Sequence, residues 1–225
     1  MTTSMPVQVR CALCGTLSQQ QVLSSTSYFG PPDLDLRPNG PARWALQFQV
    51  QHCLHCGYCA KRIGERTPKA NRTVESLIYR DVLEKAKMPA LARHFFCAAL
   101  VAEAAERREA AAWHFVEAAW ACDDSGATEQ ARTCRDRAAE MLSSALAWGD
   151  IATENVVVHG VIADLRRRAG RYEEALVACA AGEVALETDD EADTPVATVL
   201  AFIRELTESQ DDEVHNAAEA FAAED

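Results

Sequence analysis

The sequence predicts a mainly α-helical protein, an array of helical hairpins preceded by a small N-terminal antiparallel β ribbon. Two segments with the spacing Cys-x-x-Cys-Gly, at residues 11–15 and 53–57, lie in the first quarter of the chain. Extended-structure formers lie between them. After residue 67, apolar residues recur at helical spacing between short joints. We expect a ribbon domain over 1–66, a helical domain over 67–187, and an acidic linker with C-terminal helices over 188–225.

The four cysteines of the two motifs, Cys11, Cys14, Cys53 and Cys56, form one predicted metal site. Tetrahedral zinc takes thiolates at about 2.3 Å, and two intervening residues let both thiolates of a pair reach one ion. The glycine after each pair supplies the positive φ that such a turn needs. We therefore expect one structural Zn²⁺ in a zinc ribbon, although iron suits the same sulfur set. A closed four-cysteine site leaves no open position for a substrate.

Three further residues beside the second pair are possible participants. Cys59 lies three residues after Cys56, and His52 and His55 flank the pair's first cysteine. Each could replace a ligand, and Cys59 could act as a thiol sensor. The simpler interpretation makes Cys59 a bystander and both histidines exposed.

Charge divides the chain unequally. The net charge is −12, and hydrophobic residues make up 48% of the sequence. Residues 1–90 hold 11 Lys and Arg against 6 Asp and Glu, whereas residues 91–225 hold 11 against 28. Residues 1–10 lack an apolar signal segment, and no run approaches the roughly 18 apolar residues of a membrane helix. We expect a soluble, cytoplasmic protein with reduced cysteines.

The ribbon is expected to contain two main strands. Residues 16–29 favour extended structure, and residues 44–51 give the clearest strand pattern in the chain, which would place Trp44, Leu46, Phe48 and Val50 on one face. The Gly- and Pro-rich segment 30–41 between them is a predicted loop. Its Asp33 and Asp35 could bind a cation, but solvated carboxylates are the simpler interpretation. The metal would clamp this sheet at one end.

A cluster of cations follows the ribbon and raises the question of nucleic-acid binding. Its members are Lys61, Arg62, Arg66, Lys69 and Arg72. A zinc ribbon beside basic residues is typical of nucleic-acid machinery. Tyr58 is the only nearby aromatic residue for base stacking, so a solvated basic face is the preferred interpretation.

Helices are predicted over residues 67–88, 89–107, 109–122 and 127–148. In the first, an apolar stripe consists of Val74, Leu77, Ile78 and Val82. In the third, Ala111, Phe115, Ala118 and Ala119 should point inward. Cys97, Cys122, Cys134 and Cys179 lie on apolar faces and are predicted core residues.

The most informative pair of predicted helices covers residues 154–169 and 172–187. Gly170 stands in their corner, Tyr172 follows it, and the small Ala175 lies where the helices should approach most closely. This pattern is typical of a tetratricopeptide-like (TPR-like) hairpin, and residues 106–112 repeat it without the glycine. The cations Arg166, Arg167 and Arg168 could bind phosphate, but cations are favoured in the last turn of any helix.

The remaining chain is acidic. Residues 187–193 form a predicted linker, residues 194–208 a further helix, and residues 213–223 a weak last helix that could fray or be disordered.

Several of these segments together resemble an uncharacterised bacterial family of unknown function. They are the two Cys-x-x-Cys pairs, the loop with Asp33 and Asp35, the Ala118-Ala119-Trp120 helix, and residues 165–170. The resemblance covers about residues 10–185 and implies a split four-cysteine zinc ribbon followed by TPR-like helices. This sequence lacks the proline usual inside the knuckles and adds an acidic C-terminal extension. The resemblance implies no reaction.

These observations favour a non-enzymatic scaffold or adaptor that binds a protein or peptide partner. Stacked helical hairpins offer concave surfaces for such partners. The sequence contains no phosphate-binding glycine loop, no His-Glu-x-x-His and no Gly-x-Ser-x-Gly motif. The alternatives are a nucleic-acid-binding regulator that uses the basic ribbon and a thiol or zinc redox sensor that uses Cys59. The oligomeric state is left open.

Overall fold

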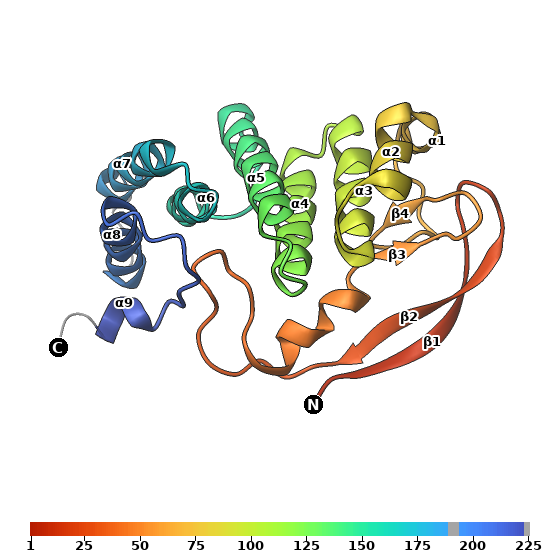
Figure 1. The fold of residues 1–225 in the computed structure, drawn as a ribbon, viewed down its shortest axis with the longest axis horizontal. Coiled ribbons are helices and arrows are strands. Elements are labelled where there is room, and N and C mark those ends of the chain that lie inside the picture. Colours follow the sequence, from red (N-terminus) through yellow and green to blue (C-terminus); the bar gives the residue numbers. More distant parts are fainter. Residues whose placement is uncertain (189–193, 223–225) are drawn as a thin grey trace.

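The computed structural model describes residues 1–188 and 194–222 and shows a row of packed helices with two β-hairpins at its N-terminal end. Figure 1 shows the helices following one another in chain order, while the first 50 residues run beneath them. The mainly α-helical fold with a small antiparallel β portion is confirmed.

Each cysteine pair forms the turn of its own hairpin. Strand β1 (Thr3–Arg10) pairs with β2 (Leu17–Ser25), and the first knuckle joins them. The short strands β3 (Gln51–His52) and β4 (Cys59–Ala60) pair around the second knuckle. Extended structure predicted within 16–29 is confirmed, but β1 was not foreseen. The ribbon therefore consists of two hairpins joined at their tips, not of one sheet that includes residues 44–51.

The prediction of a strand over residues 44–51 is wrong. Residues Gly40–Phe48 form a 3₁₀ helix, η1, that buries its alanines and leaves Trp44 71% exposed. Gly40 has φ +67°, and the following proline suits the first turn of a helix. The prediction followed the alternation of large apolar residues, which placed Trp44 on a buried face, and did not take the alanines into account. The true buried set has helical spacing: Ala42, Ala45 and Leu46.

The helical array begins with a broken helix. Residues 67–88 were expected to form one helix, but α1 (Ala70–Glu75) and α2 (Leu77–Lys85) are separated at Ser76, whose ψ is 149°. The Ser76 side chain accepts a hydrogen bond from the amide of Tyr79, which makes Ser76 the N-cap of a new helix. The break leaves Leu77 81% exposed and Ile78 exposed as well, so the expected stripe is not buried as a unit.

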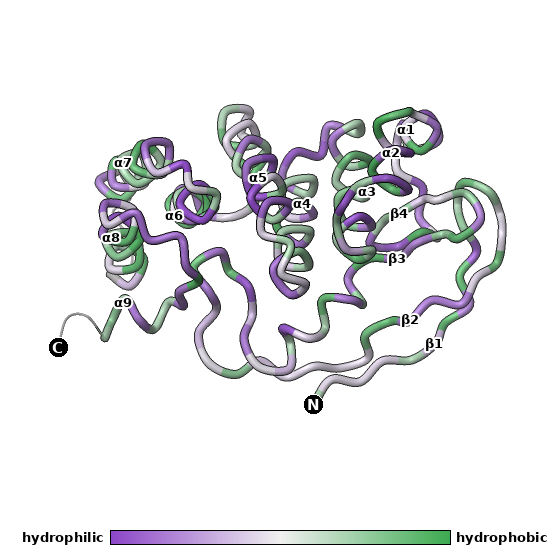
Figure 2. Tube along the Cα trace, in the orientation of Figure 1, coloured by the Kyte–Doolittle hydropathy of each residue, from purple (hydrophilic) through white to green (hydrophobic). Residues whose placement is uncertain are grey.

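The later helices follow the prediction closely. They are α3 (Ala90–Ala104), α4 (Arg108–Asp123), α5 (Thr128–Trp148), α6 (Asn155–Arg168), α7 (Tyr172–Thr188) and α8 (Thr194–Glu208). Figure 2 shows hydrophobic and hydrophilic residues alternating around their turns. The inward positions predicted for α4 are fully buried, and so are the four core cysteines of α3, α4, α5 and α7.

A shared C-terminal geometry ends five of the helices. At each end, one residue adopts a positive φ, and the amide of the next residue reaches back to a carbonyl five positions earlier. This is the Schellman pattern, in which glycine is the usual left-handed residue. Gly170 confirms the predicted corner, and Glu106 adopts the same conformation, φ +63°, without being glycine. The amide and carbonyl residues are Arg107 and Ala102, Ala127 and Cys122, Asp150 and Ala145, Arg171 and Arg166, and Asp211 and Leu206.

Residues 215–217 pair with an N-terminal loop instead of forming part of the predicted last helix. Within the described part of the predicted range, residues 213–222, only α9 (Glu219–Ala222) is helical. The residues before it pair with the loop of residues 31–37: the Leu34 amide donates to the His215 carbonyl at 3.0 Å, and Asp33 and Asn216 form a β-bridge. Asp211 accepts from the Glu213 amide, a local turn that competes with helix. Residues 223–225 and most of the predicted acidic linker, residues 189–193, lie outside the described residues.

One hydrophobic core connects the ribbon to the helices. The cluster includes Cys53, Tyr58 and Ile63 of the ribbon together with Ala70 and Phe95 of the array. The expected boundary after residue 66 marks a change of secondary structure within this core. The division into domains after residue 66 stays a prediction.

Candidate metal centre

The two knuckles share one backbone conformation. The glycine that follows each pair has a left-handed φ, +75° for Gly15 and +80° for Gly57, as the sequence predicted. In each knuckle the first cysteine's carbonyl accepts from this glycine's amide, and its own amide donates to the carbonyl five residues ahead. The bonds are Gly15 to Cys11 (2.9 Å), Gly57 to Cys53 (2.8 Å), Cys11 to Thr16 (3.0 Å) and Cys53 to Tyr58 (2.9 Å).

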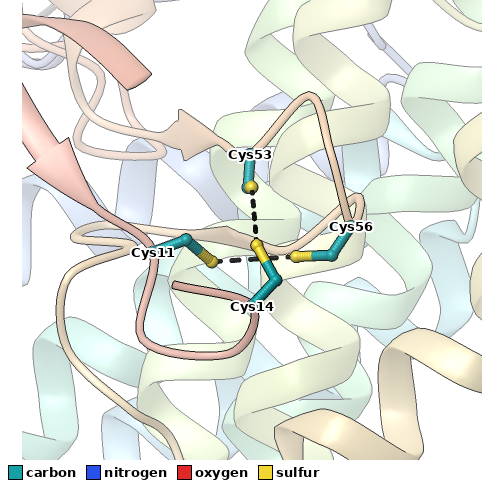
Figure 3. A group of neighbouring side chains, drawn as sticks. All are labelled: Cys11, Cys14, Cys53 and Cys56. Atoms are coloured by element: carbon teal, nitrogen blue, oxygen red, sulfur yellow. Dashed lines mark hydrogen bonds between the residues drawn. The ribbon is translucent and has the colours of Figure 1, made fainter. Parts of the chain in front are cut away.

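The four predicted ligands converge at one point. Figure 3 shows their side chains pointing toward one another from the two knuckles. The Sγ atoms of Cys11 and Cys56 lie 3.7 Å apart, those of Cys14 and Cys53 lie 3.6 Å apart, and all four sulfurs lie within 4.8 Å of one another. Four sulfurs at about 2.3 Å from a tetrahedral ion stand roughly 3.8 Å apart, so the donor set fits zinc in both chemistry and size. It fits tetrahedral iron equally well.

The pKa values of Cys11, Cys14 and Cys56 shift in different directions. Hydrogen bonds from the hydroxyl and amide of Thr16 lower the pKa of Cys14 to about 5. Burial raises the pKa of Cys56 and of Cys11, and the neighbouring thiols raise that of Cys56 further. Four thiolates at this spacing repel one another, and a divalent cation removes the repulsion with its own charge. Metal binding and full ionisation of the cluster are therefore linked.

Hydrogen bonds attach both knuckles to the rest of the molecule. The Ala12 amide of the first knuckle donates to the Ile63 carbonyl at 2.8 Å. In the second knuckle, the buried Tyr79 hydroxyl of α2 donates to the Gly57 carbonyl at 2.8 Å and accepts from the Cys59 amide at 3.0 Å. Tyr79 thus fixes the metal-binding turn to the helical array. Sequence reasoning missed this role, because nothing in a helical pattern distinguishes an anchoring tyrosine from a core one.

Cys59, His52 and His55 lie outside the group of four. Cys59 is fully buried, and its Sγ donates to the Gly57 carbonyl at 3.5 Å. Burial, together with the Cys97 thiol, raises its pKa well above the ordinary value, which disfavours a reactive thiolate. His55 is exposed as expected. The expectation for His52 is wrong: its ring is half-buried and stacks on His94 with ring centroids 4.3 Å apart.

The carboxylates of the predicted loop are not solvated. Asp35 is fully buried, accepts from the Trp120 indole at 2.8 Å, and pairs with Arg168 at 3.0 Å. Asp33 is also buried and pairs with Arg43 at 2.7 Å. A loop that carries charges into the interior needs partners there, and the helix ends supply them. This corrects the sequence-based interpretation and leaves these carboxylates engaged by arginines.

The three consecutive arginines at the end of α6 have structural roles, which was the interpretation preferred over phosphate binding. Arg167 is fully buried against Asp164 at 2.6 Å, and Arg168 pairs with both Asp35 and Asp123. Arg166 bonds Asp136 on α5 at 2.8 Å. Each guanidinium therefore has a carboxylate partner within the fold.

The five cations after the ribbon are all exposed, as both a solvated face and a nucleic-acid site require. Arg62 pairs with Glu65 and Lys69 with Glu106, both between exposed side chains. Arg66, Lys69 and Arg72 line an open hollow of about 810 Å³ beside α1.

Comparison with protein-family models, curated proteins and solved structures finds no match to this chain. The resemblance to a bacterial family with a split zinc ribbon therefore stays a prediction. Within residues 1–188 and 194–222, no helix combines the length and apolar character needed to cross a membrane.

Proposed function

We propose that this chain is a non-enzymatic interaction protein in which one structural zinc ion holds the ribbon together and the helical array binds a protein partner. The convergence of four cysteine sulfurs within 4.8 Å is the observation that supports the metal's role. With four protein ligands, such an ion has no coordination position for a substrate. It would join the tips of two hairpins that bury little apolar surface of their own, β1 being exposed along most of its length.

Exposed apolar side chains on the helices support partner binding. Scattered apolar residues are normal on any surface, but large ones that lie close together indicate interaction sites. The most exposed are Leu77 and Ile78 on α2, Trp148 on α5, and Val177 and Val184 on α7. Leu77 and Ile78 are neighbours on α2, and Val177 and Val184 lie two turns apart on one face of α7.

Partner capture tests this function. The tagged chain would be purified from its native cells after mild crosslinking, and each co-purifying protein would be produced separately for binding with the purified chain. We expect at least one partner to bind the wild type with defined stoichiometry and to bind Cys53→Ala more weakly. Capture no greater than that of the tag alone would contradict a scaffold function.

Nucleic-acid binding is the second candidate, supported by the exposure of all five cations after the ribbon. A fluorescent 20-base-pair DNA duplex would be titrated at several salt concentrations. Affinity that falls steeply with salt and is lost in the triple variant Arg66→Ala, Lys69→Ala, Arg72→Ala would support this function. Undetectable or salt-independent binding would remove it.

A further inference from the structure

A second candidate site lies far along the row of helices from the cysteines. Four segments that are distant in sequence enclose a hollow of about 260 Å³: the loop of residues 32–36, α6, α8 and the C-terminal residues 217–221. Its floor is formed by buried aliphatic side chains, namely Leu34, Val156, Leu200 and Ile203. The hollow is partly open to solvent, and nearly all of its lining residues are apolar.

Large apolar side chains stand at the mouth of this pocket. Leu36 is 38% exposed and Phe221 is 44% exposed, and both line the hollow. Leu36 has φ +66°, a left-handed conformation that costs a branched residue about 1 kcal/mol or more. A tight turn, in which the Leu36 amide donates to the Asp33 carbonyl, and the buried Asp35 beside it hold this conformation. The fold thus presents a strained, half-exposed leucine at the rim of an apolar pocket.

The pocket's size suits side chains of a macromolecule. An apolar cavity of about 150 Å³ in another protein is enough to hold benzene. A hollow of about 260 Å³ therefore has room for one or two large apolar side chains. Anchoring of this kind, with a few apolar side chains buried in a preformed pocket, dominates many protein interfaces.

Three of the four segments that enclose the pocket belong to an acidic part of the chain. Residues 150–222, which include α6, α7, α8 and α9, contain 17 Asp and Glu against 5 Arg and no Lys, a net charge of −12. Such a surface attracts basic segments and repels acidic ones. Apolar anchors flanked by Lys or Arg are complementary to both the pocket and its surroundings.

We propose that this pocket docks the apolar face of a basic amphipathic segment of a partner protein. The inference rests on the proposed interaction function and names its surface and the partner's chemistry. The segment's leucine or aromatic side chains fill the hollow between Leu36, Val199 and Phe221, and its cations face the acidic surface of the C-terminal helices.

A pocket-filling variant provides the test. Gly160 of α6 lines the hollow, and a Cβ built there lies 3.8 Å from Ile203 and 4.0 Å from Leu200, so a larger side chain can grow into the space. The probe is a fluorescent 16-residue peptide of leucine and lysine with its leucines on one helical face. We expect Gly160→Leu to weaken peptide binding at least about tenfold. Ala201→Leu adds the same side chain at an exposed position of α8 and should leave binding within about twofold.

Two further probes separate the contributions of shape and charge. A peptide with its lysines replaced by glutamate and one with its leucines replaced by glutamine should both bind at least about tenfold more weakly than the original. Circular dichroism checks that Gly160→Leu is folded; if it is not, Gly160→Ala and Val199→Arg replace it, and loss of binding in either folded variant supports the proposal.

Three results would overturn it. The first is equal binding of the leucine–lysine peptide by the wild type and the folded pocket variant. The second is equal binding of the glutamate peptide. The third is self-association that Gly160→Leu abolishes, which would assign the pocket to a second copy of this chain. A captured partner that binds wild type and Gly160→Leu equally would end the pocket proposal while leaving the interaction function intact, whereas capture of no partner would end the interaction function.

Discussion

At the scale of single residues, Tyr79 and His94 show how the helices hold the second knuckle. Tyr79 satisfies a carbonyl and an amide within three residues of one another in the metal-binding turn. His94 of α3 stacks on His52, which precedes Cys53. Both contacts lie beside the predicted ligands, so their loss should disturb the second knuckle.

Replacing Tyr79 with phenylalanine tests the anchor. The substitution leaves the Gly57 carbonyl without its 2.8 Å partner and the Cys59 amide without its acceptor, both in a buried environment. We expect the free energy of unfolding to fall by about 1–3 kcal/mol, measured by urea denaturation of the metal-loaded protein. Tyr28→Phe, at an exposed residue, is the control and should change little. Equal stabilities of Tyr79→Phe and wild type would mean that these hydrogen bonds do not contribute to stability.

The environment of His94 predicts sensitivity to acid. Burial, with His52 and Arg93 nearby, lowers the pKa of His94 to about 4, whereas an unfolded histidine titrates near 6.5. The unfolded state therefore takes up the proton first, and stability should decline as pH falls from about 6.5 toward 4. Thermal unfolding across this window should show a shallower decline in His94→Asn than in wild type. His55→Asn, at an exposed histidine, should reproduce the wild-type slope; a decline unaltered by His94→Asn would refute this assignment.

At the scale of elements, the helix corners explain which parts of the fold could be predicted. Gly170 marked its corner because a left-handed residue after a helix is usually glycine. The corner at Glu106 carried no such signal, although it has the same geometry. The 3₁₀ helix η1 was predicted as a strand because large apolar residues alternate over 44–51, whereas the residues that it buries are Ala42, Ala45 and Leu46. Ser76 broke the first predicted helix through a local hydrogen bond that apolar spacing does not report.

Substitution at the two equivalent corners tests this account. Glu106→Gly removes the strain of a left-handed glutamate and should raise the unfolding free energy by about 1 kcal/mol. The exposed pair with Lys69 that it loses contributes little. Gly170→Ala, where a Cβ meets nothing within 4 Å, should lower stability by a similar amount through its φ of +75° alone. Chemical denaturation measures the unfolding free energy of both variants. Changes of the same sign at the two corners would contradict the shared geometry.

At the scale of the whole molecule, residues 1–66 connect both ends of the helical row. The second cysteine knuckle attaches to α2, and the loop of residues 31–37 reaches α4, α6 and the C-terminal segment (Figure 1). Asp35 accepts hydrogen bonds from Trp120 and Arg168, which are 85 and 133 residues away in the sequence. No sequence pattern couples positions so far apart, which is why this loop was predicted to be solvated. The ligand cysteines could be predicted, because a metal imposes its spacing on residues that are near neighbours.

The buried Asp35 tests how strongly this loop is held. Asp35→Asn removes the charge that faces Arg168, whose guanidinium is itself almost entirely buried. Breaking a buried pair from one side costs about 3–5 kcal/mol, so urea denaturation should show a loss of that order. The exposed pair of Asp81 and Lys85 provides the comparison, and Asp81→Asn should change stability by less than about 0.5 kcal/mol. Similar small losses in both variants would show that the loop is not held through Asp35.

The central claim is that Cys11, Cys14, Cys53 and Cys56 hold one metal ion, and metal content tests it most directly. Protein purified without added metal would be analysed by elemental mass spectrometry, alongside Cys11→Ala, Cys53→Ala and the core control Cys179→Ala. We predict one zinc per chain in the wild type and in the control, and loss of the metal in both ligand variants. A wild type without bound metal, or full retention in Cys11→Ala or Cys53→Ala, would contradict the account.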